Sequence, residues 1–479
     1  MTPTLSHFIA GAFHPGSADE PLLHANPSDR DDIVARVPRA TAADVNAATA
    51  AAATALPAWR RLPGPARAEH LHRWAGVIEE RRETLARALT REVGKPISEA
   101  RGEIARCVVI LRYYAGEAVR ANGEVVPAQM ADALQFTLRE PLGVTALITP
   151  WNFPAAIPLW KAAPALAFGN TVVLKPSELS AQVAVLLAET AAAAGLPAGT
   201  FNVLLGAGEA GKALLHAEPV RAVSFTGSTG VGAQVARTCA ERNIRYQTEM
   251  GGKNVAIVLP DADLALAARL TAGGAMRYAG QKCTATSRVV VAQAVEDEFL
   301  ARLQAEVEAL PIGPVDDASC AVGPLITPAA RARVEQALAE AAGARVLGGA
   351  APRDAVFARG EFLAPALLRD VDPAARIAQE ELFGPVLTCF RARDVDEAIA
   401  LANRTRYGLS ATLFTRDLRA ALEYVRRIEV GLVRVNGDTT GVDPHAPFGG
   451  MKGSSSGSRE QGSAAREFYT ETKTVQIQA

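Results

Sequence analysis

The segment Val144-Thr-Ala-Leu-Ile-Thr-Pro-Trp-Asn-Phe-Pro154 decides the fold class, because a short apolar, β-branched run ends here at a proline-rich turn. Three similar runs follow it: Asn170–Leu174, Phe201–Leu205 and Ala222–Phe225. Alanine-rich stretches that favour helices fill most of the intervals. Apolar strands alternating with helices predict a parallel α/β sheet. Ligands bind at the carboxyl ends of such strands, so we expect the informative residues just after each one.

Helical and strand patterns also flank this region. Before it, helical composition covers 41–56, and apolar residues recur at helical spacing over 69–93 until Gly94 and Pro96. After it, a second alternating region predicts another α/β domain with strands at 254–259, 287–292 and 431–436. The helices expected there lie near 261–278, 294–309, 328–342, 394–404 and 417–427.

The composition of the 479 residues is that of an ordinary globular protein, with 49% hydrophobic and 21% charged residues. The formal charge of −1 argues against a nucleic-acid binder and against a polybasic membrane-surface protein. No signal peptide or uninterrupted apolar span is evident, so we expect no membrane association. Five scattered cysteines without a C-x-x-C pair favour a reducing, cytoplasmic location, and the scattered histidines indicate no metal site.

Glycine-rich loops follow two of the predicted strands. The loop 206–211, which includes Gly208, matches G-x-G-x-x-G but lacks the downstream acidic residue, so a simple turn is an equal alternative. The loop 225–232 opens a helix whose free N–H groups suit a pyrophosphate. Lys175 and Glu178 follow another strand and could bind an adenosine ribose, although Glu178 could also be a first-turn helix residue.

Three residues could carry covalent chemistry. Cys283 stands among small and polar residues beside Lys282, an open and electropositive setting that favours a thiolate. Glu249 precedes a Gly-Gly turn and could serve as a base, and the Asn152 amide could donate to an oxyanion. Taken singly, each residue has a more common structural interpretation: a buried inert thiol for Cys283, a capping residue for Glu249 and a turn residue for Asn152.

Six motifs together resemble the NAD(P)-dependent aldehyde dehydrogenase superfamily in order and spacing, over essentially the whole chain. They are Pro150-Trp-Asn-Phe-Pro154, Phe225-Thr-Gly-Ser-Thr-Gly-Val-Gly232, Glu249-Met-Gly-Gly-Lys253, Gly280-Gln-Lys-Cys283, Glu380-Glu-Leu-Phe-Gly-Pro385 and Pro447-Phe-Gly-Gly450. The resemblance implies a Rossmann-type cofactor domain (1–119 and 139–248) and an α/β catalytic domain (249–458). It also implies a small β-ribbon for oligomerisation (120–138 and 459–479) and a homodimer or homotetramer.

The resemblance also implies a division of roles. Cys283 attacks the aldehyde, Asn152 and the Cys283 N–H hold the oxyanion, hydride passes to the nicotinamide, and Glu249 activates the water that releases the acid. The cofactor residues that it implies are Trp151, Lys175, Glu178, Gly208, Gly227, Ser228, Gly232, Glu381 and Phe383. Glu178 predicts a preference for NAD over NADP, because its carboxylate would repel a 2′-phosphate.

Two longer stretches, 281–288 and 445–462, resemble 2-oxoglutarate semialdehyde (2,5-dioxopentanoate) dehydrogenases more specifically. Succinate semialdehyde and short-chain or aromatic aldehydes remain alternatives. By the family pattern the substrate tunnel is lined by Phe153, Trp160, Lys282, Thr284 and Phe448. We hypothesise that Lys282 lowers the pKa of Cys283 or attracts an anionic substrate; the alternative is that it faces solvent or a carbonyl.

Three rival functions are less consistent with the residues. A CoA-acylating dehydrogenase or an acyl-phosphate reductase of this fold has no need of a water-activating glutamate, so Glu249 argues against both. A non-catalytic binding protein on an enzyme scaffold is expected to lose Cys283, Glu249 or Asn152, and all three are present.

Overall fold

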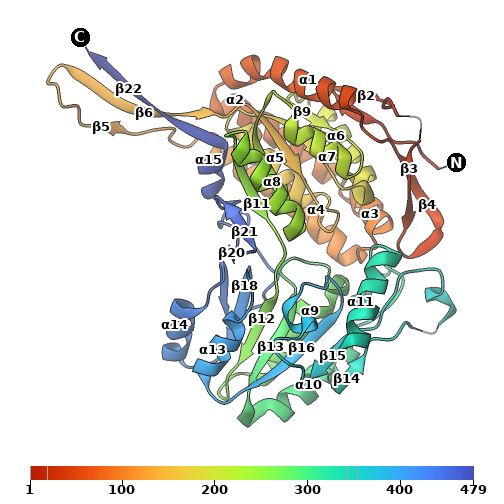
Figure 1. Cartoon of the computed structure of the whole chain (residues 1–479). Coiled ribbons are helices and arrows are strands. Elements are labelled where there is room, and N and C mark those ends of the chain that lie inside the picture. The colour runs from red at the N-terminus through yellow and green to blue at the C-terminus, as the bar shows by residue number, and fades with distance from the viewer. Residues whose placement is uncertain (1, 19, 342–343, 353, 479) are drawn as a thin grey trace.

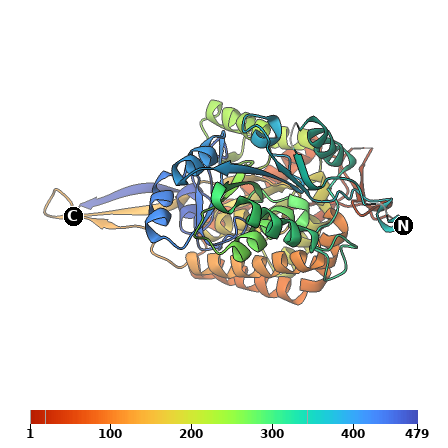
Figure 2. The ribbon, with the colours of Figure 1, turned by 90° about the horizontal axis from the view of Figure 1, so that it is seen from below.

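The computed structural model describes residues 2–18, 20–341, 344–352 and 354–478. The chain forms two lobes and a narrow ribbon that projects from the body (Figure 1). The view from below shows the same ribbon reaching out at one side, with the C-terminus at its end (Figure 2).

The first lobe is built on a sheet in which the described residues form eight strands. In spatial order they are β2 (Ala12–His14), β1 (His7–Ile9), β9 (Phe201–Val203), β8 (Thr171–Lys175), β7 (Val144–Ile148), β10 (Val220–Thr226), β11 (Arg245–Glu249) and β21 (Ser455–Gly457). The five strands from β9 to β11 pair in parallel, which confirms the fold class expected from the sequence. β21 comes from far along the chain and pairs antiparallel with β11.

The helices that pack on this sheet are α1 (Ala42–Arg61), α5 (Ala156–Ala167), α6 (Ala181–Ala193), α7 (Gly208–His216) and α8 (Thr229–Glu241). Helices α2 (Gly64–Glu80), α3 (Arg82–Val93) and α4 (Ile97–Glu117) pack against α5 and α6, and the short turn η1 (Glu178–Ser180) precedes α6. The single helical stretch expected over 69–93 is wrong, because Arg81 leaves helical geometry (φ −96°, ψ 15°) and separates α2 from α3. The apolar period nevertheless marks the buried face: Leu71, Trp74 and Ile78 have no exposed surface.

The second lobe contains a seven-stranded sheet in its described residues. Its order is β14 (Ala344–Gly348), β15 (Ala366–Arg369), β16 (Val386–Ala392), β13 (Thr286–Ala292), β12 (Asn254–Val258), β18 (Ser410–Phe414) and β19 (Leu432–Val435). Its helices are α9 (Leu264–Met276), α10 (Glu296–Glu308), α11 (Pro328–Glu340), α12 (Arg376–Gln379), α13 (Val395–Asn403) and α14 (Leu418–Arg427). The predicted helices and strands of this region match these elements within a few residues. The prediction omitted β14, β15, β16 and β18.

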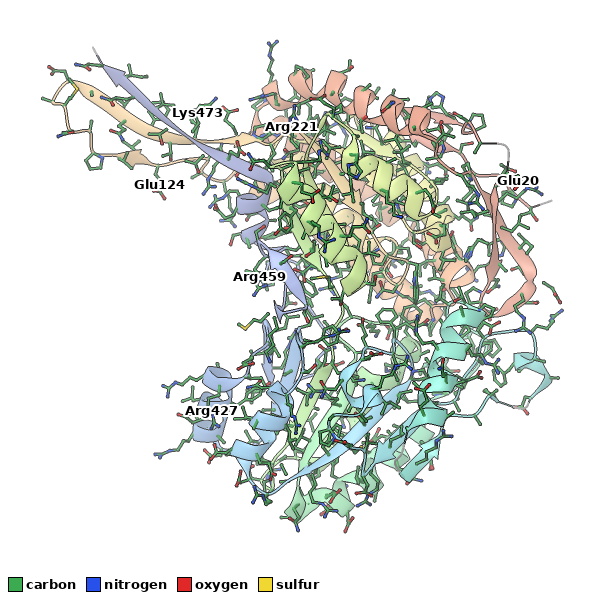
Figure 3. All side chains as sticks on the ribbon, in the orientation of Figure 1. Glu20, Glu124, Arg221, Arg427, Arg459 and Lys473 are labelled. Carbon is green, nitrogen blue, oxygen red and sulfur yellow. The ribbon has the colours of Figure 1, made fainter. Side chains whose placement is uncertain are left out.

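The projecting ribbon joins β5 (Val125–Val126), β6 (Ala133–Pro141) and β22 (Thr470–Gln478) in an antiparallel sheet. Two segments more than 300 residues apart in sequence therefore lie side by side. Glu124 and Lys473 lie on this ribbon, away from the body (Figure 3). Hairpin strands β3 (Leu22–Asn26) and β4 (Asp29–Val37), the pair β17 (Tyr407–Gly408) and β20 (Met451–Lys452), helix α15 (Ala464–Tyr469) and the turns η2 (Arg277–Gly280), η3 (Gln293–Val295) and η4 (Ala355–Phe357) complete the chain.

Helix α5 is the element that connects the core to the site. Every one of its residues is buried, and it packs between helices α2 and α4 and the strands β7 and β8. A helix held on all sides fixes the loop that precedes it, which carries Trp151, Asn152 and Phe153. In the described part of the chain, no helix combines the length and the apolar character needed to cross a membrane.

Candidate active site

Two cavities form one groove along the carboxyl ends of the first sheet. A cavity of about 400 Å³ lies beside Lys175 and Glu178, and one of about 290 Å³ contains Cys283. Four residues line both cavities: Pro150, Thr226, Gly227 and Ser228. The groove therefore runs from the end of β8 to the cysteine, which is the position expected for a ligand on a parallel sheet.

The 400 Å³ end carries groups suited to a nucleoside. Lys175 is only 5% exposed, and burial lowers the pKa of its ammonium while Glu178 and Glu209 oppose the shift. Its Nζ lies 4.0 Å from the Glu178 carboxylate, which is partly exposed. Gly208 and Gly211 line the same cavity. The 206–211 loop thus faces this end of the groove, and its placement next to Lys175 and Glu178 accords with the expected position near an adenine.

The middle of the groove meets the N-terminus of α8. Ser228 stands at the N-cap, and its side chain makes no capping hydrogen bond, so the first N–H groups of the helix can serve a ligand. Gly232 permits close packing, because a Cβ at this position would lie 2.5 Å from the Met250 sulfur. These features fit an elongated anion such as a dinucleotide pyrophosphate.

The loop before Cys283 has an unusual backbone. Tyr278, Ala279 and Gly280 all have positive φ angles, and a Cβ on Gly280 would lie 2.4 Å from the carbonyl oxygen of Gly384. Glycine is therefore required at position 280. The Gln281 side chain fixes the turn by donating to Pro324 O (3.0 Å) and accepting from the Ile326 N–H (2.9 Å). This strained and anchored turn presents the half-exposed Cys283 to the groove.

The electrostatic setting of Cys283 differs from the expectation. Burial raises the pKa of its thiol to about 12, with Glu381 and Glu249 adding to the shift and the N–H groups of Thr284 and Cys283 opposing it. The expectation of an electropositive setting that favours the thiolate is therefore wrong for this state of the protein. Lys282 does not supply a positive charge to the thiol, because its Nζ lies 2.9 Å from Glu99 on α4. It faces neither solvent nor a carbonyl, being 8% exposed.

Asn152 lies next to Cys283 in the 290 Å³ cavity. Its Nδ2 donates to the carbonyl of Gln281 at 3.0 Å, which orients the amide and leaves its second N–H for another acceptor. Asn254 supports the same loop from the other side, because its Nδ2 donates to the carbonyls of Cys283 and Ala285, each at 2.8 Å.

Glu249 ends β11 and is 2% exposed. Ser455 donates to its Oε2 at 2.5 Å, whereas its buried Oε1 has no partner among the described residues. Burial and then Glu460 raise the pKa of Glu249 well above its usual value, and Ser455, Lys161 and Arg459 oppose them. A Cβ on Gly449 would lie 2.9 Å from this free oxygen, so the glycine makes room for the carboxyl group.

Glu381, Phe383 and Trp151 line the same 290 Å³ cavity as Cys283. Glu381 accepts from the Gly252 N–H at 3.1 Å, and burial raises the pKa of its carboxyl to about 7. Phe383 has a positive φ of 57°, a strained conformation for an aromatic residue, and its ring meets Trp151 edge-on at 5.6 Å. Arg333 of α11 also lines the cavity, a residue that the sequence analysis did not single out.

A third cavity of about 800 Å³ is lined by Phe153 and Lys282, which are neighbours in sequence of Asn152 and Cys283. The other three expected tunnel residues are buried and line neither this cavity nor the one at Cys283. Trp160 donates its indole N–H to Glu460 at 2.9 Å and contacts the Phe448 ring, and Thr284 lies 4% exposed against Thr440.

Two buried ion pairs support the site, and the sequence analysis missed both. Lys161 and Glu460 pair beneath the sheet, where Ser224 and Gln247 also donate to Glu460. The other pair is Lys95 and Glu103, of which Glu103 lines the 800 Å³ cavity. The sequence signal for such a buried pair is a polar residue within an apolar helical pattern, as at Glu103. No cluster of three or more potential metal-ligating residues occurs in the described ranges.

The Lys95–Glu103 pair joins the two loops of the site. Glu103 Oε1 accepts from the N–H groups of Ala155 (2.9 Å) and Ala156 (3.0 Å) at the start of α5, just after Asn152. The Lys95 ammonium lies 3.8 Å from the Phe153 ring centroid and 4.6 Å from that of Tyr278. One pair thus contacts both the Asn152 loop and the Cys283 loop.

The pKa of Cys283 can be tested by alkylation, because Cys283 is half-exposed and the other four cysteines are buried. We expect its iodoacetamide rate to rise about tenfold per pH unit from about pH 7 to about pH 9 without a plateau, since only the thiolate reacts. Glu381→Gln removes a charge that raises this pKa, so the rate at a given pH should increase. Cys283→Ala is the control, and a plateau near neutral pH in the unmodified chain would contradict this assignment.

Replacing Lys95 tests the buried pair. Lys95→Met leaves Glu103 charged and without its partner, so urea denaturation should show a loss of about 3 kcal/mol in unfolding free energy. The double variant Lys95→Met/Glu103→Gln removes the stranded charge and keeps an acceptor for the α5 N–H groups, so it should recover most of that loss. A loss below about 1 kcal/mol in the single variant would rule out the coupling described for these loops.

Known proteins resemble this chain over its full length. The chain is 42% identical to the alpha-ketoglutaric semialdehyde dehydrogenase of Bacillus subtilis, with 98% of each chain covered. It is 41% identical to the alpha-ketoglutarate semialdehyde dehydrogenase of Haloferax volcanii, with 99% of each covered. It is 40% identical to the NADP-dependent succinate-semialdehyde dehydrogenase of Escherichia coli, covering 98% of this chain and 97% of that one.

Solved structures agree with these relatives. An NAD-dependent aldehyde dehydrogenase from Sinorhizobium meliloti superposes with a TM-score of 0.95 at 35% identity, covering 100% of this chain and 95% of that chain. An NADP-dependent enzyme of Escherichia coli superposes with a TM-score of 0.95 at 38% identity, covering 99% of this chain and 98% of that chain. The family model described as the aldehyde dehydrogenase family matches residues 14–475. Both levels of the resemblance in the sequence are thereby confirmed, and the chain belongs to the aldehyde dehydrogenase family.

Proposed function

We propose that this protein oxidises an aldehyde to a carboxylic acid with NAD(P), and that its substrate is 2-oxoglutarate semialdehyde. The observation that carries the proposal is the placement of Cys283. It lines a groove that suits a dinucleotide, and its sequence neighbour Lys282 lines a separate cavity. A cysteine in a cofactor groove, next to a residue that lines a second cavity, is the arrangement that a covalent oxidation requires.

Cys283 and Asn152 carry the first half of the reaction in this proposal. The Cys283 sulfur loses its proton and attacks the aldehyde carbon, giving a thiohemiacetal oxyanion. The free N–H of the Asn152 amide and the Cys283 backbone N–H donate to that oxygen. Because Gln281 already orients the Asn152 amide, little reorganisation accompanies the step. A nicotinamide ring bound in the groove supplies the hydride acceptor, and Cys283 is left as a thioester.

Glu249 carries the second half. Burial raises its pKa above that of an ordinary carboxylate, which makes its ionised form a stronger base. In this structure its Oε1 faces Gly449 rather than the cavity at Cys283, so the side chain turns toward the cysteine to accept a proton from water. The resulting hydroxide displaces the thiolate, and the acid leaves.

The cofactor is held along the groove by the residues expected from the sequence. Lys175 and Glu178 bind the adenosine ribose, Ser228 and the 227–232 loop receive the pyrophosphate, and Glu381 binds the nicotinamide ribose. Trp151 and Phe383 form the wall at the nicotinamide end. The partly exposed Glu178 carboxylate disfavours a 2′-phosphate, which supports NAD as the preferred cofactor, with NADP accepted.

Charge supports the choice of substrate. Four basic side chains and three acidic ones line the 800 Å³ cavity, which fits an aldehyde bearing a carboxylate at its far end. The relatives named above act on such semialdehydes. Succinate semialdehyde is the second candidate, because its carboxylate is attracted by the same basic side chains. A neutral aliphatic or aromatic aldehyde would gain nothing from them. A CoA-acylating role leaves the buried Glu249 without a purpose.

The ribbon supports assembly with further copies of the chain. It projects into solvent and exposes Val125 (76%), Leu134 (51%) and Ile477 (55%), which a lone chain would leave in water. We therefore propose a homodimer or homotetramer with the division expected from the sequence, in which 120–138 and 459–479 serve oligomerisation. Free cysteines throughout the described chain support a reducing cytoplasmic compartment, which cell fractionation would test.

An aldehyde panel tests the function directly. With 2,5-dioxopentanoate, succinate semialdehyde, propanal and benzaldehyde, formation of reduced cofactor without CoA or phosphate should give the highest kcat/KM for 2,5-dioxopentanoate. NAD should exceed NADP by about tenfold, which corresponds to roughly 1.4 kcal/mol of repulsion. Cys283→Ala should abolish the formation of reduced cofactor with every aldehyde. Equal kcat/KM across the panel would contradict the substrate, and activity only with CoA would contradict hydrolysis.

Light scattering on the full chain tests the assembly. The mass should be two or four times 50.2 kDa. The variant Leu134→Glu/Ile477→Glu places charges on the ribbon and should shift the protein toward the monomer, whereas charges at the already exposed Leu418 (73%) on α14 should not. A monomeric unmodified protein would refute the proposed role of the ribbon.

A further inference from the structure

The 800 Å³ cavity contains several cations that are not equivalent. Its basic residues are Arg106, Arg277, Lys282 and Arg434, and its acidic residues are Glu99, Glu103 and Asp443. Two of the acids already have partners within the protein: Glu99 pairs with Lys282 and Glu103 with Lys95. Lys282, the cation closest in sequence to Cys283, is therefore neutralised and does not offer a free charge to a substrate.

Of the remaining cations, Arg277 is exposed, whereas Arg434 and Arg106 are half-buried. Arg106 is distinguished by the state of its guanidinium. Its Nε atom is fully buried and has no hydrogen-bond partner among the described residues. Asp443 acts on the guanidinium electrostatically, but no ion pair joins them in the described chain. Because no ion pair with another described residue holds the guanidinium, its N–H groups that reach the cavity remain free to bind an anion.

Arg106 lies on α4 and lines the same cavity as Phe153 and Lys282. Glu99, Gly102, Arg106 and Val109 repeat at three- and four-residue spacing, so they share one helical face, and this face lines the cavity. Gly102 leaves open space, since a Cβ built there meets no atom within 4 Å. The helix face thus combines a free cation with room for a substrate beside it.

We propose that Arg106 binds the carboxylate at the far end of the substrate and sets the preference for aldehyde acids over neutral aldehydes; this rests on the function proposed above. The guanidinium donates two parallel N–H groups to a carboxylate, which fixes the distance between that group and the aldehyde carbon. Arg106 contacts the end of the substrate that does not react, so it acts on specificity.

The test compares two five-carbon aldehydes that differ in one charged group, glutarate semialdehyde and pentanal. Arg106→Met should lower kcat/KM for glutarate semialdehyde and for 2,5-dioxopentanoate by about 10- to 100-fold, mainly through KM. For pentanal the change should stay within about twofold. Arg106→Lys keeps the charge without the fork, so its loss should be intermediate. Arg101→Met is the matched control, because Arg101 lies on the same helix in an exposed pair with Glu83.

The outcomes separate this inference from the proposed function. Equal losses for the acid and for pentanal would overturn it, because they would assign Arg106 a structural role. If the unmodified enzyme prefers the acid and Arg106→Met keeps that preference unchanged, the inference is overturned and the proposed function stands. An unmodified enzyme that oxidises pentanal as well as the acid would refute both.

Discussion

The ion pair between Lys95 and Glu103 holds together the two loops on which this site depends. Both side chains are almost fully buried, so each charge requires the other. Glu103 also caps the first turn of α5, and Lys95 lies against the rings of Phe153 and Tyr278. The Asn152 amide and the Cys283 sulfur are therefore placed by the same contact. Catalysis by a fixed donor depends on such placement, because reorganisation during the reaction would add to the barrier.

The acidic groups of the site share a second property. Burial raises the pKa of Cys283 and that of Glu381, and burial with the nearby Glu460 raises that of Glu249. Burial is the largest cause for all three, and neighbouring carboxylates add to it for Cys283 and Glu249, so proton loss is harder at each group than in water. A neutral thiol is a poor nucleophile and also resists oxidation. In the proposed mechanism, Glu249 and Cys283 each act only after losing a proton, which makes the resting protein unreactive.

The sequence predicted the fold and most of the site because its signals are local. Val144–Ile148 is a strand with the bounds expected, since an apolar β-branched run ends there at a Thr-Pro turn. Val386–Ala392 was missed, because a cysteine and an arginine interrupt its pattern and its burial comes from the neighbouring strands. The break at Arg81 was missed for the opposite reason, since the apolar period continues across it.

Partners distant in sequence were the main source of error at the site. Lys282 precedes Cys283 in sequence and therefore predicts a positive setting for the thiol. Its ammonium instead pairs with Glu99, which lies 183 residues away in sequence. Trp160 resembles a tunnel residue, yet Glu460 holds its indole in the interior. Ser455, the first residue of β21, and Gly449, a few residues before it, accommodate the Glu249 carboxyl, and both are placed by β21 joining the first sheet. Such contacts arise from the fold as a whole, and no local pattern encodes them.

In the proposed mechanism, Cys283 carries the acyl group and Glu249 releases it. A single-turnover experiment mixes Glu249→Gln with 2,5-dioxopentanoate and NAD, follows reduced cofactor in the first turnover, and determines the mass of the peptide containing Cys283. We expect about one equivalent of NADH per subunit followed by very slow turnover, with an acyl group on Cys283. Continued turnover at the rate of the unmodified enzyme, or a burst with Cys283 unmodified, would contradict this mechanism.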